Sequence, residues 1–154
     1  MKVGDVTSAV VASPRRCRVD AHGVTIDEVL AASRSGVQRL SPEQTLAAMS
    51  RGALVIDTRT EVQRRDQGEM PGVLVIDRTV LEWRLDPASP DRIREATSYE
   101  MQIVVVCRQG YSSSLAAASL RAVGLSRATD LEGGVAAWVA AGLPLWDTPS
   151  DVRR

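Results

Sequence analysis

Residues 101–123 constrain the fold of this chain most, because they join an apolar run to a polar loop and then to a helix-like segment. The run Ile103–Val106 is short, wholly apolar and β-branched, a pattern typical of a strand buried on both faces of a parallel sheet. Cys107 follows it directly, and the serines at 112, 113 and 114 are candidate N-cap residues for the next helix. The pattern therefore predicts a cysteine between the carboxyl end of a buried strand and the N-terminus of a helix.

The predicted surroundings of Cys107 favour a reactive thiol. Backbone N–H groups and the positive end of a helix stabilise a thiolate over a thiol, which makes the sulfur a nucleophile near neutral pH. Gly110 allows the loop to curl with its amides turned inward, and Arg108 adds a fixed positive charge. A lone cysteine after an apolar strand is usually a small buried hydrophobe, but that role does not explain Arg108 and Gly110 beside it.

Composition limits the classes of fold and ligand. At 154 residues the chain is long enough for one domain with a substantial core. Its 19 basic and 19 acidic residues balance, so no overall positive charge favours nucleic acid. No apolar stretch reaches membrane-spanning length and no signal-like segment opens the sequence, so we expect a cytoplasmic protein that binds no membrane.

The two cysteines and the single histidine give no sign of a metal site. Cys17 and Cys107 form neither a disulfide framework nor a paired zinc motif, and a reducing compartment would keep both as thiols. The only histidine, His22, lies near Cys17 in a segment without apolar periodicity, to which we assign no chemistry.

Apolar runs alternate with helix-like segments, which predicts an α/β fold with a mainly parallel sheet. The predicted strands are residues 37–40, 53–56, 73–76, 103–106 and 128–131. The predicted helices are residues 25–32, 41–51, 61–67, 79–85, 112–123 and 134–140, and capping boxes open two of them, at 25–28 and 41–44. We expect residues 1–24 to be a mobile leader, residues 25–146 to form the domain, and residues 147–154 to be a C-terminal tail.

Polar residues follow two of the predicted strands. Asp57 and Arg59 come after the strand at 53–56, as Cys107 comes after the strand at 103–106. Because ligands of parallel α/β sheets bind beyond the carboxyl ends of the strands, we expect all three at one rim. A carboxylate at a strand end usually accepts hydrogen bonds from backbone or arginine, so we interpret Asp57 and Arg59 as structural support for the site.

Four stretches together resemble the rhodanese-like family, in its order and spacing. They are Val-Ile-Asp-Thr-Arg at 55–59, Gly-Glu-Met-Pro-Gly at 68–72, Cys-Arg-Gln-Gly-Tyr-Ser at 107–112, and Leu-Glu-Gly-Gly at 131–134 followed by Trp138 and Ala-Gly-Leu-Pro at 141–144. The resemblance covers about residues 37–146. It implies a rhodanese-like fold, with a central parallel five-stranded sheet and helices on both faces.

The resemblance also implies a function and a mechanism. A donor such as thiosulfate would give its outer sulfur to Cys107, and cyanide or a thiol would then take it from the persulfide. The site would need neither a metal nor an organic cofactor, and its partners would be small sulfur-containing anions and thiols. The donor, the acceptor and any protein partner are not fixed by the fold.

The resemblance assigns roles to individual residues. Cys107 would be the catalytic nucleophile, and the persulfide would be bound by the loop amides and side chains of Arg108, Gln109, Gly110, Tyr111, Ser112 and Ser113. In some members a basic residue between the first two motifs contacts the donor, and we favour Arg64 over Gln63 for that role. Arg64 and Arg65 also fit a solvated helix face. Glu69 stands where the family usually has histidine, which leaves the hydrogen bonding of that turn open.

Two other functions stay open and a third is excluded. The cell-cycle phosphatases that share this fold need an arginine six residues after the cysteine to clamp phosphate, and here that residue is Ser113. A regulatory or sulfur-carrier module that keeps the cysteine but turns over little substrate is the main alternative. A cysteine hydrolase lacks its base, because His22 lies in the predicted leader.

Overall fold

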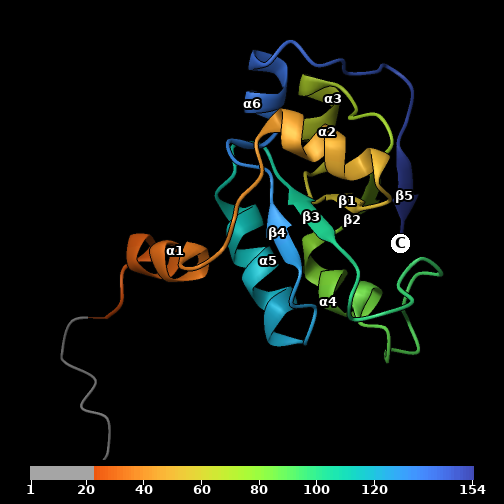
Figure 1. Ribbon diagram of the computed structural model, residues 1–154. Helices are drawn as coiled ribbons and strands as arrows, with labels where there is room; N and C mark the ends of the chain where they lie inside the picture. Colours follow the sequence, from red (N-terminus) through yellow and green to blue (C-terminus); the bar gives the residue numbers. More distant parts are fainter. Residues whose placement is uncertain (1–22) are drawn as a thin grey trace, which may run out of the picture.

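A five-stranded parallel sheet forms the centre of the structure, a computed structural model that describes residues 23–154 (Figure 1). The strands lie in the spatial order β4 (Ala128–Asp130), β3 (Ile103–Val106), β1 (Leu54–Asp57), β2 (Leu74–Ile76) and β5 (Asp151–Arg153). The register pairs Asp57 with Val106, so β1 and β3 end at the same level. This confirms the α/β fold with a parallel sheet.

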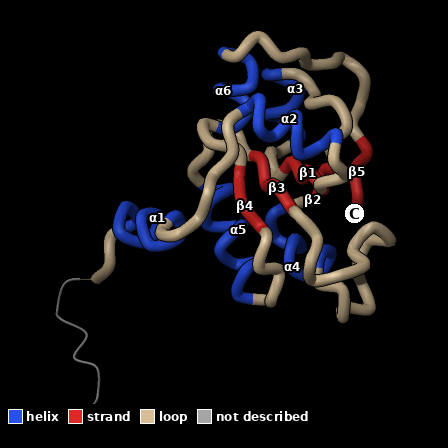
Figure 2. The backbone as a smooth tube through the Cα atoms, in the orientation of Figure 1, coloured by secondary structure: helices blue, strands red, loops and turns tan. Residues whose placement is uncertain are grey.

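Helices cover both faces of the sheet (Figure 1). On one face lie α2 (Pro42–Ser50), α3 (Glu61–Gln67) and α6 (Gly134–Ala140). On the other lie α4 (Leu81–Leu85), which follows the 3-10 turn η1 (Arg78–Val80), and α5 (Ser112–Ala122). The first helix, α1 (Ile26–Arg34), packs against α5. A long loop over residues 86–102 connects α4 to β3 (Figure 2).

The apolar run of β3 is explained by two cores, one on each side of the sheet. Ile103 and Val105 belong to the cluster under α4 and α5. Val104 and Val106 belong to the cluster with α2 and α6, which also contains Trp138. Since alternate residues of a strand point to opposite faces, a strand covered on both faces has to be apolar at every position.

The fifth strand is not the one that we predicted. Residues 151–153, expected to belong to a tail, form β5 and pair with β2. In the predicted strand 37–40, only Leu40 pairs, through an isolated bridge to Leu131. β5 is short and mostly exposed, so its sequence lacks the apolar run that marks the inner strands.

The N-termini of three helices are fixed by capping boxes. Those at Thr25 and Ser41 are confirmed, and Thr60 with Gln63 forms a third at the start of α3. Residues 1–22, with Cys17, His22 and most of the predicted leader, lie outside the described residues. Between residues 23 and 154 no helix is long and apolar enough to cross a membrane.

Candidate active site

Cys107 lies directly after β3, and its sulfur faces hydrogen-bond donors from the following loop. The backbone N–H of Gly110 donates to Sγ at 3.1 Å and that of Ser113, in the first turn of α5, at 3.4 Å. Ser113 Oγ lies 3.2 Å from the same sulfur. Cys107 is buried, with 6% of the residue exposed.

Two opposing influences act on the pKa of the Cys107 thiol. Burial raises it, but hydrogen bonds from the hydroxyls of Ser112 and Ser113 and from the loop amides lower it. The hydrogen bonds outweigh burial, so the pKa lies below its ordinary value. The loop therefore favours the thiolate, which is the nucleophilic form.

The start of α6 holds the outer side of the loop. The N–H of Val135 donates to the carbonyl of Cys107 at 2.9 Å, and the N–H of Ala136 to that of Arg108 at 3.1 Å. Gly134 permits this approach, because a Cβ at its position would lie 2.4 Å from the Cys107 carbonyl oxygen. With these carbonyls bonded to α6, the amides of Gly110 and Ser113 face the sulfur.

The serines after the loop support Asp130 and do not cap α5. The N-cap residue is Tyr111, without a side-chain capping bond, which corrects our prediction of a serine cap. The hydroxyls of Ser113 and Ser114 donate to Asp130 Oδ2 at 2.8 and 2.9 Å. Asp130 is itself buried at the end of β4 and accepts two hydrogen bonds from Arg39.

Four loop side chains lie at the rim of the site, because Arg108, Gln109, Tyr111 and Ser112 are exposed. Tyr111 is 61% exposed, and the guanidinium of Arg34 stacks over its ring at 5.7 Å. The Arg108 side chain makes no ion pair or hydrogen bond with any residue in 23–154, so it is free to meet an anion.

Asp57 and Arg59 form a buried ion pair at the end of β1, beside the end of β3 that precedes Cys107. Arg59 Nη2 lies 2.7 Å from Asp57 Oδ2, both side chains are inaccessible to solvent, and Arg59 also donates to the carbonyl of Gly68. The pair thus ties the end of β1 to the turn that precedes β2. The pair is therefore structural within this turn, and its support of the Cys107 site stays a prediction.

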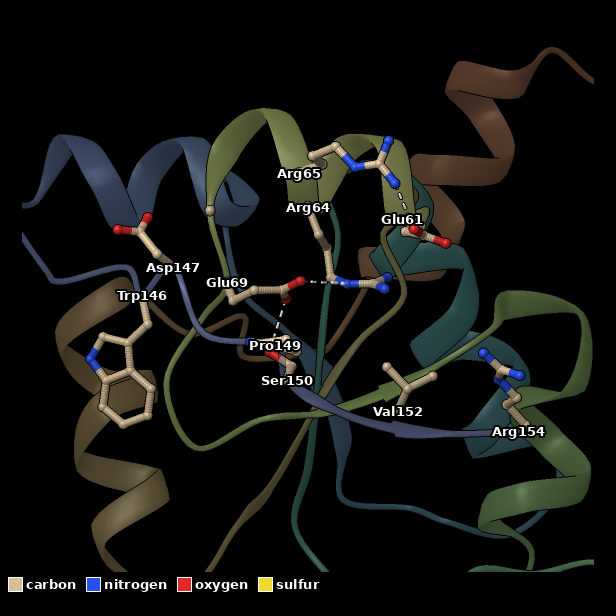
Figure 3. A pocket seen from close by; sticks show the side chains of 11 residues that line it. Glu61, Arg64, Arg65, Glu69, Trp146, Asp147, Pro149, Ser150, Val152 and Arg154 are labelled. Atoms are coloured by element: carbon tan, nitrogen blue, oxygen red, sulfur yellow. Dashed lines mark hydrogen bonds and ion pairs between the residues drawn. The ribbon is translucent and has the colours of Figure 1, made fainter.

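Arg64 differs from both sequence interpretations. It is buried, unlike its neighbour Arg65, which is 72% exposed. Its guanidinium donates to the carbonyl of Arg59 at 2.7 Å and to Glu69 at 3.2 Å. Figure 3 shows it beside Glu69 at a hollow of about 500 Å³ that Cys107 does not line. The geometry therefore gives no support to a contact between Arg64 and a donor at Cys107.

The contacts of Glu69 define the hydrogen bonding of the turn, which the sequence left open. Its carboxylate accepts hydrogen bonds from Arg64 and from the hydroxyl of Ser150, and its backbone pairs with Trp146. The turn therefore holds the C-terminal segment in place (Figure 3).

Sequence reasoning missed three residues close to the loop. They are Arg34, Arg39 and Asp130, whose side chains bond to the loop or to its serines. Asp130, like Asp57, is a carboxylate at the end of a strand. The argument that identified Asp57 from the sequence therefore applies to Asp130 as well. The two arginines carry no comparable local signal.

Comparison with known proteins points to one family. The sequence model of the rhodanese-like domain family matches residues 41–141. A thiosulfate sulfurtransferase, GlpE, from Pseudomonas entomophila is 35% identical over 104 residues, which are 68% of this chain and 86% of that protein.

Two solved structures share the fold. One is a protein of unknown function from Rhodopseudomonas palustris, described as a possible tyrosine phosphatase. It is 27% identical with a TM-score of 0.70, over 87% of this chain and 99% of that one. The other, a thiosulfate sulfurtransferase from Pseudomonas aeruginosa, is 24% identical with a TM-score of 0.56, over 76% of this chain and 21% of that one. The family match spans the loop around Cys107 and the turn at Gly134 that supports it, and on these grounds the chain belongs to the rhodanese-like domain family.

Proposed function

We propose that this protein is a sulfurtransferase that carries sulfane sulfur as a persulfide on Cys107. The observation that carries the proposal is the sulfur of Cys107 facing the amides of Gly110 and Ser113 and the hydroxyl of Ser113. Such donors stabilise negative charge on the attacking sulfur and on the outer sulfur of the persulfide. The sulfurtransferases among its relatives support the same chemistry.

The mechanism follows from this geometry. The Cys107 thiolate attacks the outer sulfur of thiosulfate, so a sulfur–sulfur bond forms while the bond to the sulfonate sulfur breaks and sulfite leaves with its electron pair. A thiolate or cyanide then attacks the outer sulfur of the persulfide. The electron pair of the broken bond returns to Cys107 as thiolate, and the loop amides stay bonded to sulfur throughout. Since Cys107 is only 6% exposed, we propose a small donor.

The direct test is the mass of the intact protein after incubation with thiosulfate and without reducing agent. We expect the gain of one sulfur atom, lost again on addition of cyanide. The gain should vanish in Cys107→Ser and persist in Cys17→Ser, the matched variant of the second cysteine. A protein without an adduct, or with one that survives Cys107→Ser, would contradict the proposal; the first result would favour the interaction module.

A phosphatase is the second candidate, favoured by the relative from Rhodopseudomonas palustris. The sixth residue after Cys107 argues against it. Ser113 stands there, and its hydroxyl bonds to the sulfur and to Asp130 instead of clamping a phosphate as an arginine would. We therefore expect no hydrolysis of p-nitrophenyl phosphate under conditions in which thiosulfate is consumed.

We also propose that the protein is cytoplasmic, because a reducing compartment would keep Cys107 as a free thiol. Thiosulfate, mercaptopyruvate and glutathione persulfide, compared at steady state, would identify the preferred donor.

A further inference from the structure

Two arginines from outside the family match bond to one carbonyl of the active-site loop. Arg34 is the last residue of α1, and Arg39 lies between α1 and α2, whereas the family match begins at residue 41. Arg34 Nη2 donates to the carbonyl of Gly110 at 2.8 Å, and Arg39 Nη2 donates to it at 2.9 Å. A carbonyl oxygen has two lone pairs, and these two guanidinium groups are its nearer donors, with the Ser114 hydroxyl farther away at 3.4 Å.

The bonded carbonyl belongs to the residue whose amide faces the sulfur. The N–H of Gly110 donates to Cys107 Sγ at 3.1 Å, and its φ of +80° lies in the left-handed region. Because glycine adopts many backbone conformations, Gly110 by itself does not fix the direction of its N–H. The carbonyl and the N–H of Gly110 belong to neighbouring peptide planes that meet at its Cα, so two bonds to the carbonyl fix one plane and limit how the other can turn.

Arg39 is also linked to the sulfur indirectly, through Asp130 and Ser113. It donates to both carboxylate oxygens of Asp130, at 2.9 and 3.0 Å. Asp130 accepts from the hydroxyl of Ser113 at 2.8 Å, and Ser113 Oγ lies 3.2 Å from Cys107 Sγ. The charge of Arg39 balances this buried carboxylate, which would otherwise oppose a thiolate nearby.

Arg34 supports the same serine pair from the other side. Its Nε donates to the hydroxyl of Ser114 at 3.0 Å, and Ser114 donates to Asp130 at 2.9 Å. α1 is fixed for this contact by its packing on α5 and by its capping box. Both arginines therefore act on the loop and on the serines next to it.

We propose that Arg34 and Arg39 are positioning residues of the active site, and that the segment preceding the family match is a functional part of it. They hold the Gly110 amide and the Ser113 hydroxyl against Cys107 without touching the sulfur or a substrate. The importance of this positioning for turnover rests on the proposed sulfurtransferase function. The charged groups around the loop are Arg34, Arg39, Arg108, Asp130, Glu132 and the Asp57–Arg59 pair.

The test measures the thiolate directly. Alkylation of Cys107 by iodoacetamide is followed on its own peptide by mass spectrometry, which separates it from Cys17, at a series of pH values. Arg34→Gln and Arg39→Lys should each move the rise of the rate to higher pH. We expect a rate about three- to tenfold lower near neutral pH, the size of one weakened hydrogen bond to a charged group, and an unchanged limiting rate at high pH.

Two further variants separate positioning from general damage. Arg94→Ala removes an arginine that is 84% exposed and lies outside the site, so its profile should match the wild type. If Arg39→Lys fails to fold because Asp130 is left buried with an imperfect partner, Arg34→Gln decides, because its side chain is only partly buried. Profiles of Arg34→Gln and any folded Arg39 variant that coincide with that of Arg94→Ala would overturn the proposal.

The outcome is independent of the sulfurtransferase assay. A shifted alkylation profile in a protein that takes no sulfur from thiosulfate would keep the positioning role and reject the proposed function. Sulfur transfer with an unshifted profile in both arginine variants would do the reverse.

Discussion

The hydroxyl of Ser113 bonds to two acceptors that compete for its single proton. When Cys107 is a thiol, Ser113 can donate to Asp130 and accept from the sulfur; when Cys107 is a thiolate, the sulfur also needs that proton. Asp130 tolerates the change, because Ser114 and Arg39 continue to donate to it. The Ser113 hydroxyl can therefore turn its proton toward Cys107 when the sulfur becomes a thiolate.

Ser113→Ala should slow sulfur transfer by about ten- to a hundredfold at neutral pH, since a hydrogen bond to a charged sulfur is lost. Ser113 lowers the pKa of Cys107. Its removal raises that pKa, so the deficit should be largest below the pKa and vanish at alkaline pH, where both proteins are thiolates. The measurement is the pH profile of persulfide formation. Ser119→Ala, on the far part of α5, is the control; a deficit that persists at alkaline pH would mean damage to the loop instead.

The sequence predicted the part of the site that is local in the chain. Cys107, Gly110 and Ser113 lie within one loop, so their spacing alone indicates that they meet. Arg39 and Asp130 are 91 positions apart, and their pairing depends on where the chain passes after α1. A surface arginine and a buried one look alike in sequence, which also explains why neither interpretation of Arg64, as a donor contact or on a solvated face, matches its buried position.

Among the elements, α6 and the active-site loop depend on each other through Gly134. Its φ is +60°, and a Cβ there would lie 2.4 Å from the carbonyl oxygen of Cys107. Gly142 has a similar φ of +74° but open space around it. A substitution at Gly142 therefore measures the cost of the left-handed backbone conformation alone. A substitution at Gly134 adds the cost of contact with the loop.

Gly134→Ala should lower the free energy of unfolding by at least about 3 kcal/mol and abolish persulfide formation, because either α6 or the loop has to move. Gly142→Ala should cost about 1–2 kcal/mol, the strain of the left-handed conformation alone, and keep the activity. Urea unfolding and the thiosulfate mass assay measure both effects. Equal losses of stability in the two variants would show that the contact at Gly134 is relaxed at little cost.

Elements with a strong local pattern were predicted correctly, whereas β5, which has a weak one, was not. β3 has an unbroken apolar run, and α1 and α2 begin with capping boxes. β5 has only three residues, two of them exposed, and it becomes a strand because β2 offers it an unpaired edge. Whether β2 has an unpaired edge depends on the order of the strands in the sheet, so it cannot be predicted from a short stretch of sequence.

For the whole molecule, the strand order separates the site from the C-terminal segment. Cys107 follows β3, whereas β5 lies at the opposite edge with β1 and β2 between them. β5 is fixed by its pairing with β2 and by the ion pair of Arg153 with Glu95, which precedes β3 in the long loop. Removal of β5 should therefore lower the stability of the fold without changing the reactivity of Cys107.

A chain that stops after Ser150 lacks β5 and the Arg153–Glu95 pair. We expect it to lose about 1–3 kcal/mol of stability, the usual range for removal of a small packed feature, because β2 becomes an edge strand with unpaired backbone groups. Hydrogen exchange at the amides of Leu74–Ile76 should accelerate. Persulfide formation per folded molecule should stay unchanged, because β1 and β3 keep their pairing. The control stops after Arg153, which removes only Arg154 and should match the full chain. Loss of sulfur transfer in the folded shorter chain would show instead that β5 acts on Cys107 through β2 and β1.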